Sequence, residues 1–200
     1  ALTKVLKVLP DNHHGIDRRV IRELIKELRG RYPGKSRSWV RRSLRRFLNN
    51  DVKALSNNTW VVKGEPSMGD KLPQYIVRFI NGKYACDCQA GPWGGSRGLC
   101  THIGAVIASQ VYEELMRTAY AAVIRAKCLD TELVLTDSNA SIHKVTNGNE
   151  TIYLVRTSGE VTVKALMACN DEIREVMIST KPMKNWEIMN ILRMSRRSSP

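Results

Sequence analysis

Residues 84–106 read YACDCQAGPWGGSRGLCTHIGAV, and this stretch decides how the centre of the chain folds. It holds two pairs of candidate metal ligands, Cys86-x-Cys88 and Cys100-x-His102, separated by an eleven-residue loop that is rich in glycine. Glycine and proline allow such a loop to fold back tightly. Three thiolates and one imidazole form a common closed tetrahedral zinc site. We therefore expect one structural Zn²⁺ ion held by Cys86, Cys88, Cys100 and His102.

The segments on both sides of the ligand pairs support this expectation. Gln74 to Ile80 alternates and is rich in β-formers, Asn81-Gly82 is a strong type I′ hairpin signal, and the returning strand runs into Cys86. After the second pair, apolar residues at helical spacing predict a helix from Ile103 to about Lys127, because neither proline nor an internal break interrupts it. Its apolar composition predicts burial between modules or against another chain.

Over residues 74–115 the chain closely resembles the SWIM zinc finger. The resemblance lies in the strand-turn-strand, the two ligand pairs in this order, and the following Ile103-Gly104-Ala105-Val106. It implies that the same four residues bind zinc. SWIM modules stand beside helicase, transposase or recombination-associated domains, where they are thought to bind DNA or proteins. The resemblance therefore implies a binding module, without an activity.

The expected zinc is structural because a catalytic zinc keeps an open position for water, with a Glu or His base nearby. Asp87 lies between two ligands, and we expect it to shape the turn or to make a surface contact. On the glycine-rich loop, Trp93 and Arg97 are candidates for touching a partner, with packing over the metal as the alternative.

Positive charge is concentrated in the first third of the chain. The 200 residues carry a net charge of +13, of which residues 1–63 hold 16 Lys+Arg against 5 Asp+Glu, a net of +11. Residues 64–200 hold 16 against 14, a net of +2. Blocks of such different charge indicate different modules, and the basic one suits a polyanionic partner. A hydrophobic content of 42% excludes a wholly disordered basic tail.

The basic segment has the order of a small winged helix-turn-helix. Asp17 is the expected N-cap of a first helix that ends near Gly30, and Ser36 or Ser38 is the expected cap of a second. Two short strands are expected at Val52 to Leu55 and Thr59 to Lys63.

The second helix carries the chemistry of this segment. Its apolar positions are Val40, Leu44, Phe47 and Leu48, and a group of arginines without any acid lies on the opposite side. Such a group repels itself unless an anion lies against it, and guanidinium groups bind phosphates bidentately. A solvated face is the alternative. We predict that nucleic acid is contacted by Arg37, Arg41, Arg42, Arg45 and Arg46, with Arg31 and Lys35 in the flanking turn.

We expect duplex DNA as the partner of a non-enzymatic regulator, accessory or packaging factor. One alternative is an RNA- or ribosome-associated zinc protein, and another is a protein-interaction adaptor that uses the zinc finger and the apolar helix. No phosphate-binding loop, dinucleotide fingerprint, nucleophile elbow, HExxH motif or paired-carboxylate cluster occurs in the sequence. We therefore expect no enzymatic activity.

The expected fold class is α+β. The expected parts are a winged-helix-like module at 1–63, a linker at 64–73, a zinc module with its helix at 74–127 and a small α/β extension at 128–200. In the extension we expect strands at Leu133 to Leu135, Ile142 to Val145, Ile152 to Arg156 and Val161 to Ala165, and helices at Asp171 to Met177 and Trp186 to Met194. Cys128 and Cys169 have no partner at metal-ligand spacing and are expected to be buried small hydrophobes.

The hydropathy of the sequence indicates where in the cell the protein is located. No stretch approaches the ~18 apolar residues that span a bilayer. The start of the sequence is too short and too interrupted by lysine for a secretory signal. We expect a cytoplasmic, nucleic-acid-associated protein that is neither secreted nor bound to a membrane.

Overall fold

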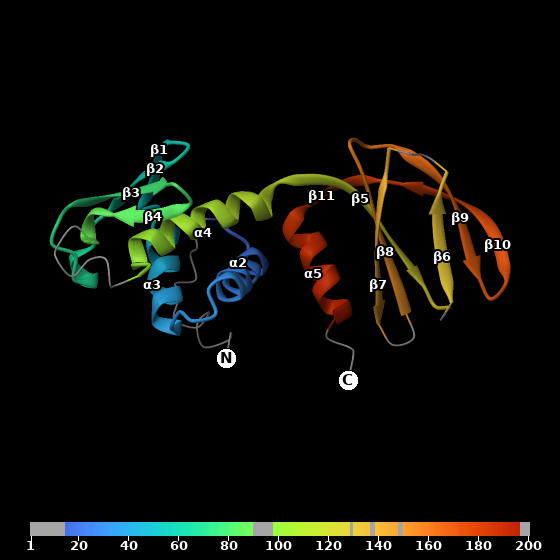
Figure 1. Cartoon of the computed structure of the whole chain (residues 1–200), viewed down its shortest axis with the longest axis horizontal. Helices are drawn as coiled ribbons and strands as arrows, with labels where there is room; N and C mark the ends of the chain where they lie inside the picture. The colour runs from blue at the N-terminus through green and yellow to red at the C-terminus, as the bar shows by residue number, and fades with distance from the viewer. Residues whose placement is uncertain (1–14, 90–97, 129, 137–138, 148–149, 197–200) are drawn as a thin grey trace. The chain divides into compact units, whose positions relative to one another are not determined.

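The computed structural model describes residues 15–89, 98–128, 130–136, 139–147 and 150–196. In these residues the chain is mixed α and β, with four α-helices and antiparallel sheets (Figure 1). It divides into two compact units, Ala1–Leu115 and Met116–Pro200, which we call the N-terminal and C-terminal units.

The N-terminal unit begins with helices α2 (Arg18–Arg31) and α3 (Arg37–Leu48). The side chain of Asp17 accepts a hydrogen bond from the Arg19 backbone N–H at 2.8 Å, which confirms the predicted cap. Of the two candidate caps for α3, Ser36 is the one that accepts from the Trp39 N–H, at 3.1 Å. The apolar faces of both helices are buried, as the periodicity predicted; the buried hydrophobic residues are Val20, Ile21, Leu24, Ile25, Leu28, Trp39, Val40, Leu44 and Leu48.

A four-stranded antiparallel sheet follows, in the order β1-β2-β3-β4. Its strands are β1 (Val52–Ser56), β2 (Thr59–Lys63), β3 (Gln74–Ile80) and β4 (Lys83–Cys86). Asn81 and Gly82 have φ of 50° and 76°, as the predicted type I′ turn between β3 and β4 requires. Because β2 pairs with β3, the expected winged-helix-like and zinc modules share one sheet and pack as one unit.

The segment between β2 and β3, predicted as a linker, is an ordered connection. It contains the 3₁₀ helix η1 (Pro66–Met68), and the Gly64 N–H donates to the carbonyl of Pro73 at 2.8 Å, which closes the segment on itself. A Cβ on Gly64 would lie 2.0 Å from the Leu72 carbonyl oxygen, so only glycine fits there.

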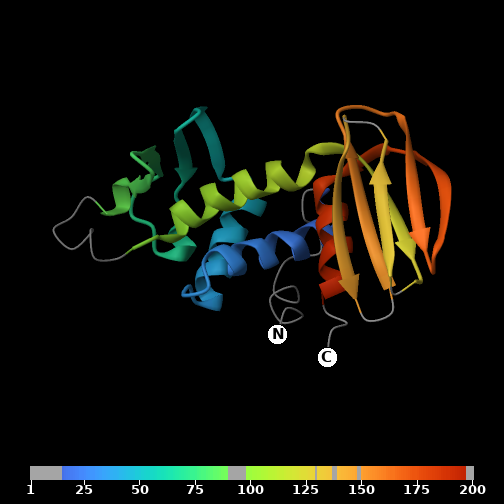
Figure 2. The same cartoon turned by 45° about the vertical axis from the view of Figure 1, so that its right-hand side comes forward.

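Helix α4 (Thr101–Met116) is buried along most of its length, as its apolar composition predicted. It lies between α2 and α3 on one side and the four-stranded sheet on the other (Figure 2). The Phe47 and Tyr112 rings pack with centroids 5.3 Å apart, and the Tyr84 hydroxyl on β4 donates to Gln110 at 2.6 Å. The partner that buries this helix is thus the rest of its own unit.

The prediction that this helix continues to Lys127 is wrong. It ends at Met116, and the chain continues as β5 (Thr118–Ala126), which pairs with β8 (Glu150–Thr157) along seven residues. No glycine or proline marks this boundary, and the strand forms because tertiary pairing outweighs local propensity.

In its described residues, the C-terminal unit contains two antiparallel sheets and one helix. One sheet has the order β11-β5-β8-β7 and the other β10-β9-β6. The further elements are β6 (Thr131–Leu135), β7 (Ser141–Asn147), β9 (Thr162–Cys169), β10 (Glu172–Ser179), β11 (Lys181–Lys184) and α5 (Asn185–Arg196). Tyr153 and Val155 of β8 join a core with residues of the second sheet, whereas Leu154 packs with Ile188 of α5. Strand β8 is therefore covered on both faces.

Most predictions for this unit are confirmed. Three of the four expected strands lie within β6, β7 and β8, the fourth coincides with the start of β9 except for Val161, and Trp186 to Met194 lies within α5. The helix expected at Asp171 to Met177 is instead β10: Asn170 and Asp171 have φ of 51° and 65°, and they form the two-residue turn that joins β9 to β10. The unit is thus mainly β, with one helix.

Cys128 and Cys169 were predicted to be buried small hydrophobes without a partner at metal-ligand spacing; the predicted burial is wrong, and their disulfide was not predicted. The two residues form a disulfide with Cα atoms 5.9 Å apart, and both are half-buried. The pairing of Thr131 with Cys169 in neighbouring strands brings the two thiols together across a sequence separation of 41. Sequence alone does not reveal that register.

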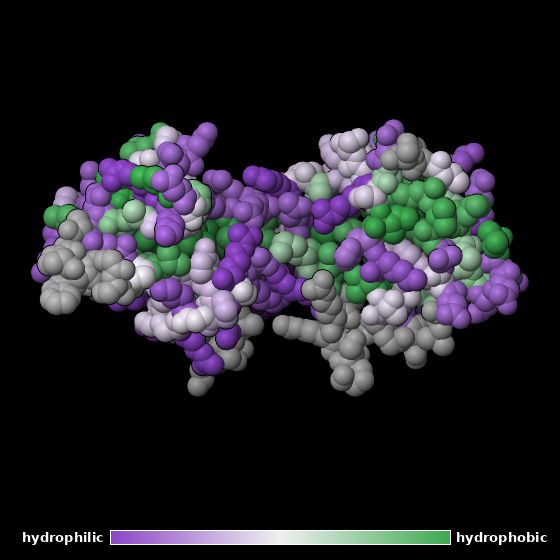
Figure 3. Space-filling model, in the orientation of Figure 1, coloured by the Kyte–Doolittle hydropathy of each residue, from purple (hydrophilic) through white to green (hydrophobic). Residues whose placement is uncertain are grey.

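The outer face of the three-stranded sheet carries large apolar side chains, and an extensive apolar area of the C-terminal unit appears in green in Figure 3. The most exposed of these side chains are Val134 at 55%, Ile173 at 73% and Met177 at 57%. Within the described part of the chain, no helix combines the length and the apolar character needed to cross a membrane.

Candidate metal centre

The structure brings the four predicted metal ligands together. One ligand atom from each of Cys86, Cys88, Cys100 and His102 lies within 4.8 Å of all the others. The Sγ atoms of Cys86 and Cys100 are each 3.8 Å from Nδ1 of His102. Ligand atoms of a tetrahedral zinc site, with metal–sulfur bonds of ~2.3 Å and metal–nitrogen bonds of ~2.0 Å, lie roughly 3.5–3.8 Å apart. The donor set therefore fits one zinc ion.

Each ligand is placed by the end of a regular element. Cys86 is the buried last residue of β4, and Cys88 lies in the 3₁₀ helix η2 (Asp87–Gln89) that follows. Cys100 precedes α4, and His102 is in the first turn of that helix. Asp87 accepts from the Ile76 N–H and from Arg78, each at 3.3 Å, so it supports the turn. Trp93 and Arg97 lie outside the described residues.

The thiols of Cys86 and Cys88 stabilise negative charge on Cys100. Hydrogen bonds from Cys86 and then Cys88 lower the pKa of the Cys100 thiol far below its ordinary value, and the Ile103 N–H at the start of α4 contributes, at 3.5 Å from its sulfur. The same hydrogen bonds have the opposite effect on the two donors. Hydrogen bonding to Cys100 is the main cause that raises the pKa of the Cys88 thiol to about 11, and it also raises the pKa of the Cys86 thiol. A divalent cation would stabilise all three thiolates together, which is the chemistry that this cluster favours.

His102 is fixed from the side opposite the thiols. Its Nε2 lies 3.1 Å from Oδ1 of Asp70, and its ring stacks on Tyr75 with centroids 4.0 Å apart. The Tyr75 hydroxyl accepts from the backbone N–H groups of Lys71 and Leu72 at 3.0 and 3.1 Å. The ring therefore has one orientation, with Nδ1 toward the sulfur atoms.

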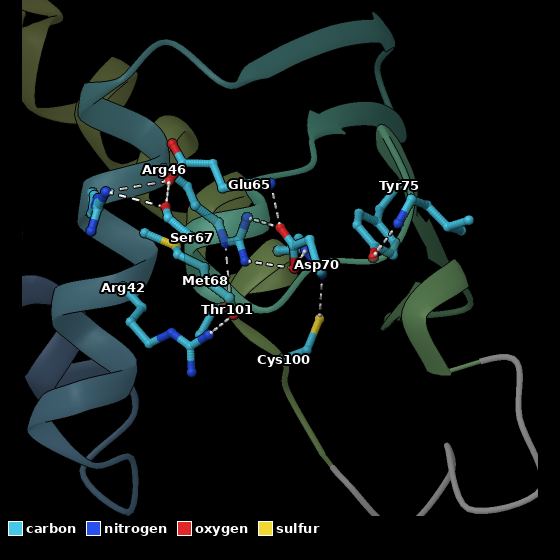
Figure 4. Close-up of polar contacts among 12 residues, drawn as sticks. Arg42, Arg46, Glu65, Ser67, Met68, Asp70, Tyr75, Cys100 and Thr101 are labelled. Atoms are coloured by element: carbon cyan, nitrogen blue, oxygen red, sulfur yellow. Dashed lines mark hydrogen bonds and ion pairs between the residues drawn. The ribbon is translucent and has the colours of Figure 1, made fainter.

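Asp70 in turn is held by Arg46 of α3 (Figure 4). The guanidinium donates to both carboxylate oxygens, at 2.5 and 3.0 Å, and the Glu65 N–H donates to one of them at 2.7 Å. Burial by itself raises the pKa of the Asp70 carboxyl, but these hydrogen bonds outweigh it and the net shift is downward. Sequence reasoning missed Asp70 because it lies in the segment predicted as a linker, 32 residues before His102.

The predicted arginine group is divided by the fold. The Arg46 side chain is 1% exposed and is engaged within the protein, so a nucleic acid cannot reach it. Arg42 is half-buried and donates to the Met68 carbonyl. Arg45 is 52% exposed and lies 3.7 Å from the Glu65 carboxylate. The segment after β2 therefore covers part of this helix face.

Three arginines remain exposed at intervals of four residues along α3: Arg37, Arg41 and Arg45, which we call the arginine row. Within the described residues, neither Arg37 nor Arg41 forms an ion pair. Arg31, predicted in the flanking turn, is the last residue of α2 and pairs with Glu114 at 2.7 Å, and Lys35 in the turn donates to the Leu99 carbonyl at 3.2 Å. Both side chains are therefore already engaged in polar contacts within the N-terminal unit.

Comparisons with known proteins give no relative: no family model matches the chain, and no curated protein or solved structure matches it. The candidate site thus rests on the geometry of the chain itself.

Proposed function

We propose that the chain is a non-enzymatic, zinc-containing nucleic-acid-binding protein that prefers duplex DNA. The observation that supports this proposal best is the arginine row, three exposed guanidinium groups on one helix that contains no acidic residue. Arginines at this spacing repel one another in water and are stabilised by phosphate groups. In helix-turn-helix proteins the second helix enters the major groove, and among the described residues α3 follows α2 in a helix-helix-hairpin order.

The distribution of charge supports the same proposal. Residues 1–115 contain 20 Lys+Arg against 10 Asp+Glu, a net charge of +10, whereas residues 116–200 contain 12 against 9, a net of +3. Phosphate contacts supply most of the affinity of non-specific nucleic-acid binding. The N-terminal unit is therefore the proposed binding unit.

Zinc has a structural role in this proposal. Cys86, Cys88, Cys100 and His102 would hold the ion, and four protein ligands leave no position for a reacting water. Bound zinc would cross-link the end of β4 to the start of α4. We include in the proposal the assignment of this centre to a SWIM-like finger and of α2, α3, β1 and β2 to a winged-helix-like arrangement.

Duplex binding at several salt concentrations tests the proposal. Changing Arg37, Arg41 and Arg45 together to Ala should weaken binding and reduce the slope of log affinity against log salt by about 3, at roughly 0.9 per phosphate contact. The matched control changes three exposed cations of the C-terminal unit, Arg156, Lys164 and Lys181, to Ala, which removes the same net charge. Equal affinity of the two triple variants would refute the assignment of α3.

Two alternatives are separated by simple measurements. Competition between duplex DNA and structured RNA distinguishes the RNA- or ribosome-associated alternative. The adaptor alternative predicts a complex with a protein that survives nuclease treatment and high salt. Helix α4 is buried inside its own unit, so an adaptor would rely on the surface around the zinc centre rather than on this helix.

A further inference from the structure

Helix α3 contacts the metal-binding segment at two separate points. Near its start, the indole Nε1–H of Trp39 donates to the carbonyl oxygens of Leu99 and Cys100, at 2.9 and 3.2 Å. Near its end, Nε of Arg46 donates to the hydroxyl of Thr101 at 3.3 Å, while the rest of the guanidinium holds Asp70. Residues near both ends of α3 thus hydrogen-bond to the segment that carries Cys100 and His102.

Between these points the backbones of α3 and α4 approach closely. A Cβ on Gly104 would lie 2.0 Å from Oγ of Ser43 and 2.7 Å from the Trp39 ring. The first turn of α4 is therefore tightly packed against α3, so a displacement of one helix requires the other to adjust.

The polar side chains that link α3 to the metal-binding segment are buried, and each needs the others as hydrogen-bond or charge partners. The side chains of Arg46, Asp70 and His102 are 1%, 8% and 6% exposed. Removing one partner from a buried charge pair leaves the other charge uncompensated, which is strongly destabilising. Arg46 therefore needs Asp70 in place, and Asp70 accepts from Arg46, the Glu65 N–H and the His102 ring together.

Asp70 also selects the tautomer of His102. When Nε2 carries the proton and donates it to Asp70, Nδ1 keeps its lone pair, and this is the atom 3.8 Å from two of the sulfur atoms. A carboxylate that accepts from the second nitrogen of a metal-binding histidine fixes its orientation and raises its basicity.

We propose that Asp70 and Arg46 are positioning residues of the metal centre, and that they link metal binding thermodynamically to the position of α3. The inference rests on metal binding by the proposed finger and does not require nucleic acid. Linkage between two sites is reciprocal. If the contacts of Arg46 favour metal binding, bound metal favours those contacts, and with them the observed position of α3, by the same free energy. The loss of metal affinity in an Arg46 variant therefore measures this coupling. Arg46, predicted as a phosphate contact, thereby acts on the metal.

The test is the affinity of the full chain for Zn²⁺, measured by competition with a chelator. Asp70→Asn keeps a hydrogen-bond acceptor for His102 but removes the negative charge that holds Arg46. Arg46→Lys keeps the positive charge but removes the bidentate hydrogen bond to Asp70. Both should bind Zn²⁺ about 10- to 100-fold more weakly, the usual effect of outer-shell changes. The matched control is Glu114→Gln, which breaks the ion pair with Arg31 elsewhere in the same unit. It should bind Zn²⁺ as the wild type does.

A second readout separates positioning from general loss of structure. At saturating Zn²⁺ all variants should be folded by circular dichroism, while the NMR resonance of the Trp39 indole N–H shifts in Arg46→Lys and stays in place in Glu114→Gln. Zn²⁺ affinities of both Asp70→Asn and Arg46→Lys within twofold of the control would overturn the inference. So would a wild-type chain that binds no Zn²⁺. Failure to bind a duplex, with Zn²⁺ affinity reduced as expected, would refute the proposed function and leave this inference standing.

Discussion

The Nε2 atom of His102 lies 3.1 Å from Oδ1 of Asp70, so the histidine of the metal centre is bonded to a carboxylate that Arg46 holds in place. This relationship joins two features that look independent in the sequence, the cysteine-histidine cluster and the arginine-rich helix. It also explains why one arginine of that helix is buried while Arg37, Arg41 and Arg45 face outward.

Loss of a metal ligand should unfold one unit and spare the other. Cys86→Ser or His102→Ala should reduce the zinc content from about one ion per chain to near zero and unfold the N-terminal unit, because binding free energy in such a site is folding free energy. The core of the C-terminal unit contains no metal ligand and should remain folded. Metal analysis with hydrogen exchange resolves the two units. A wild type that is fully folded without metal would contradict the expectation.

Zinc affinity should fall steeply with acidity. Because the N-terminal unit is expected to unfold without metal, the thiols of Cys86, Cys88 and Cys100 start from their ordinary pKa of about 8.5, and all three must lose a proton to bind. Log affinity should therefore rise by about three per pH unit between pH 7 and 8. Chelator competition across this range measures the slope. A slope near two would show that one of the three thiols is already ionised in the metal-free chain.

A buried carboxyl should make the N-terminal unit less stable at high pH. Burial, and then the hydrogen bond and charge of Glu65, raise the pKa of Asp51 from 3.8 to about 6. Its side chain has an oxygen without a hydrogen-bond partner among the described residues. The folded form favours the protonated carboxyl, so this contribution is full below pH 3.8 and is lost as the pH rises through about 6.

Asp51→Asn should therefore stabilise the unit relative to wild type, on the order of 1 kcal/mol more at pH 8 than at pH 5.5, both at saturating Zn²⁺, because the unit would lose its metal at lower pH. Urea unfolding at the two pH values measures this difference. Asp130→Asn, at an exposed position, is the control and should show no such dependence. Equal effects of Asp51→Asn at both pH values would contradict the raised pKa.

The disulfide should stabilise the C-terminal unit alone. Closing a loop across the sequence separation of 41 is worth about 4 kcal/mol in the chain-entropy account. Cys128→Ser with Cys169→Ser should lower the unfolding temperature of this unit and leave zinc content unchanged, since neither residue is a metal ligand. Calorimetry of the zinc-loaded chain measures the unfolding temperature of this unit. An unchanged unfolding transition of the C-terminal unit would count against the disulfide.

Two glycine substitutions in helices should have opposite signs. Gly104→Ala places a methyl group 2.0 Å from Ser43 Oγ and should cost about 1–3 kcal/mol by overpacking. Gly30→Ala, in α2, meets nothing within 4 Å and should stabilise by about 0.4–1 kcal/mol through helix propensity and chain entropy. Chemical unfolding of the zinc-loaded variants gives both values. Similar effects of the two changes would argue against the close approach of α3 and α4.

Features whose cause is local were predictable. The caps Asp17 and Ser36 and the turn Asn81-Gly82 form as predicted because the deciding atoms lie within a few residues. Asn170-Asp171 carries a local turn signal of the same kind, and it joins β9 to β10 where a helix was predicted. Strand β5 had no local signal: it follows α4 without a break and is a strand because it pairs with β8.

The sequence by itself determined the four candidate metal ligands and the apolar side of α3, because ligand spacing and helical periodicity are properties of short segments. Only the tertiary structure decided that Arg46 is buried against Asp70, that Asp70 holds His102, and that Cys128 pairs with Cys169. These three contacts join residues 24, 32 and 41 positions apart. Contacts at such separations depend on how helices and strands pack, and no short-range pattern encodes that packing.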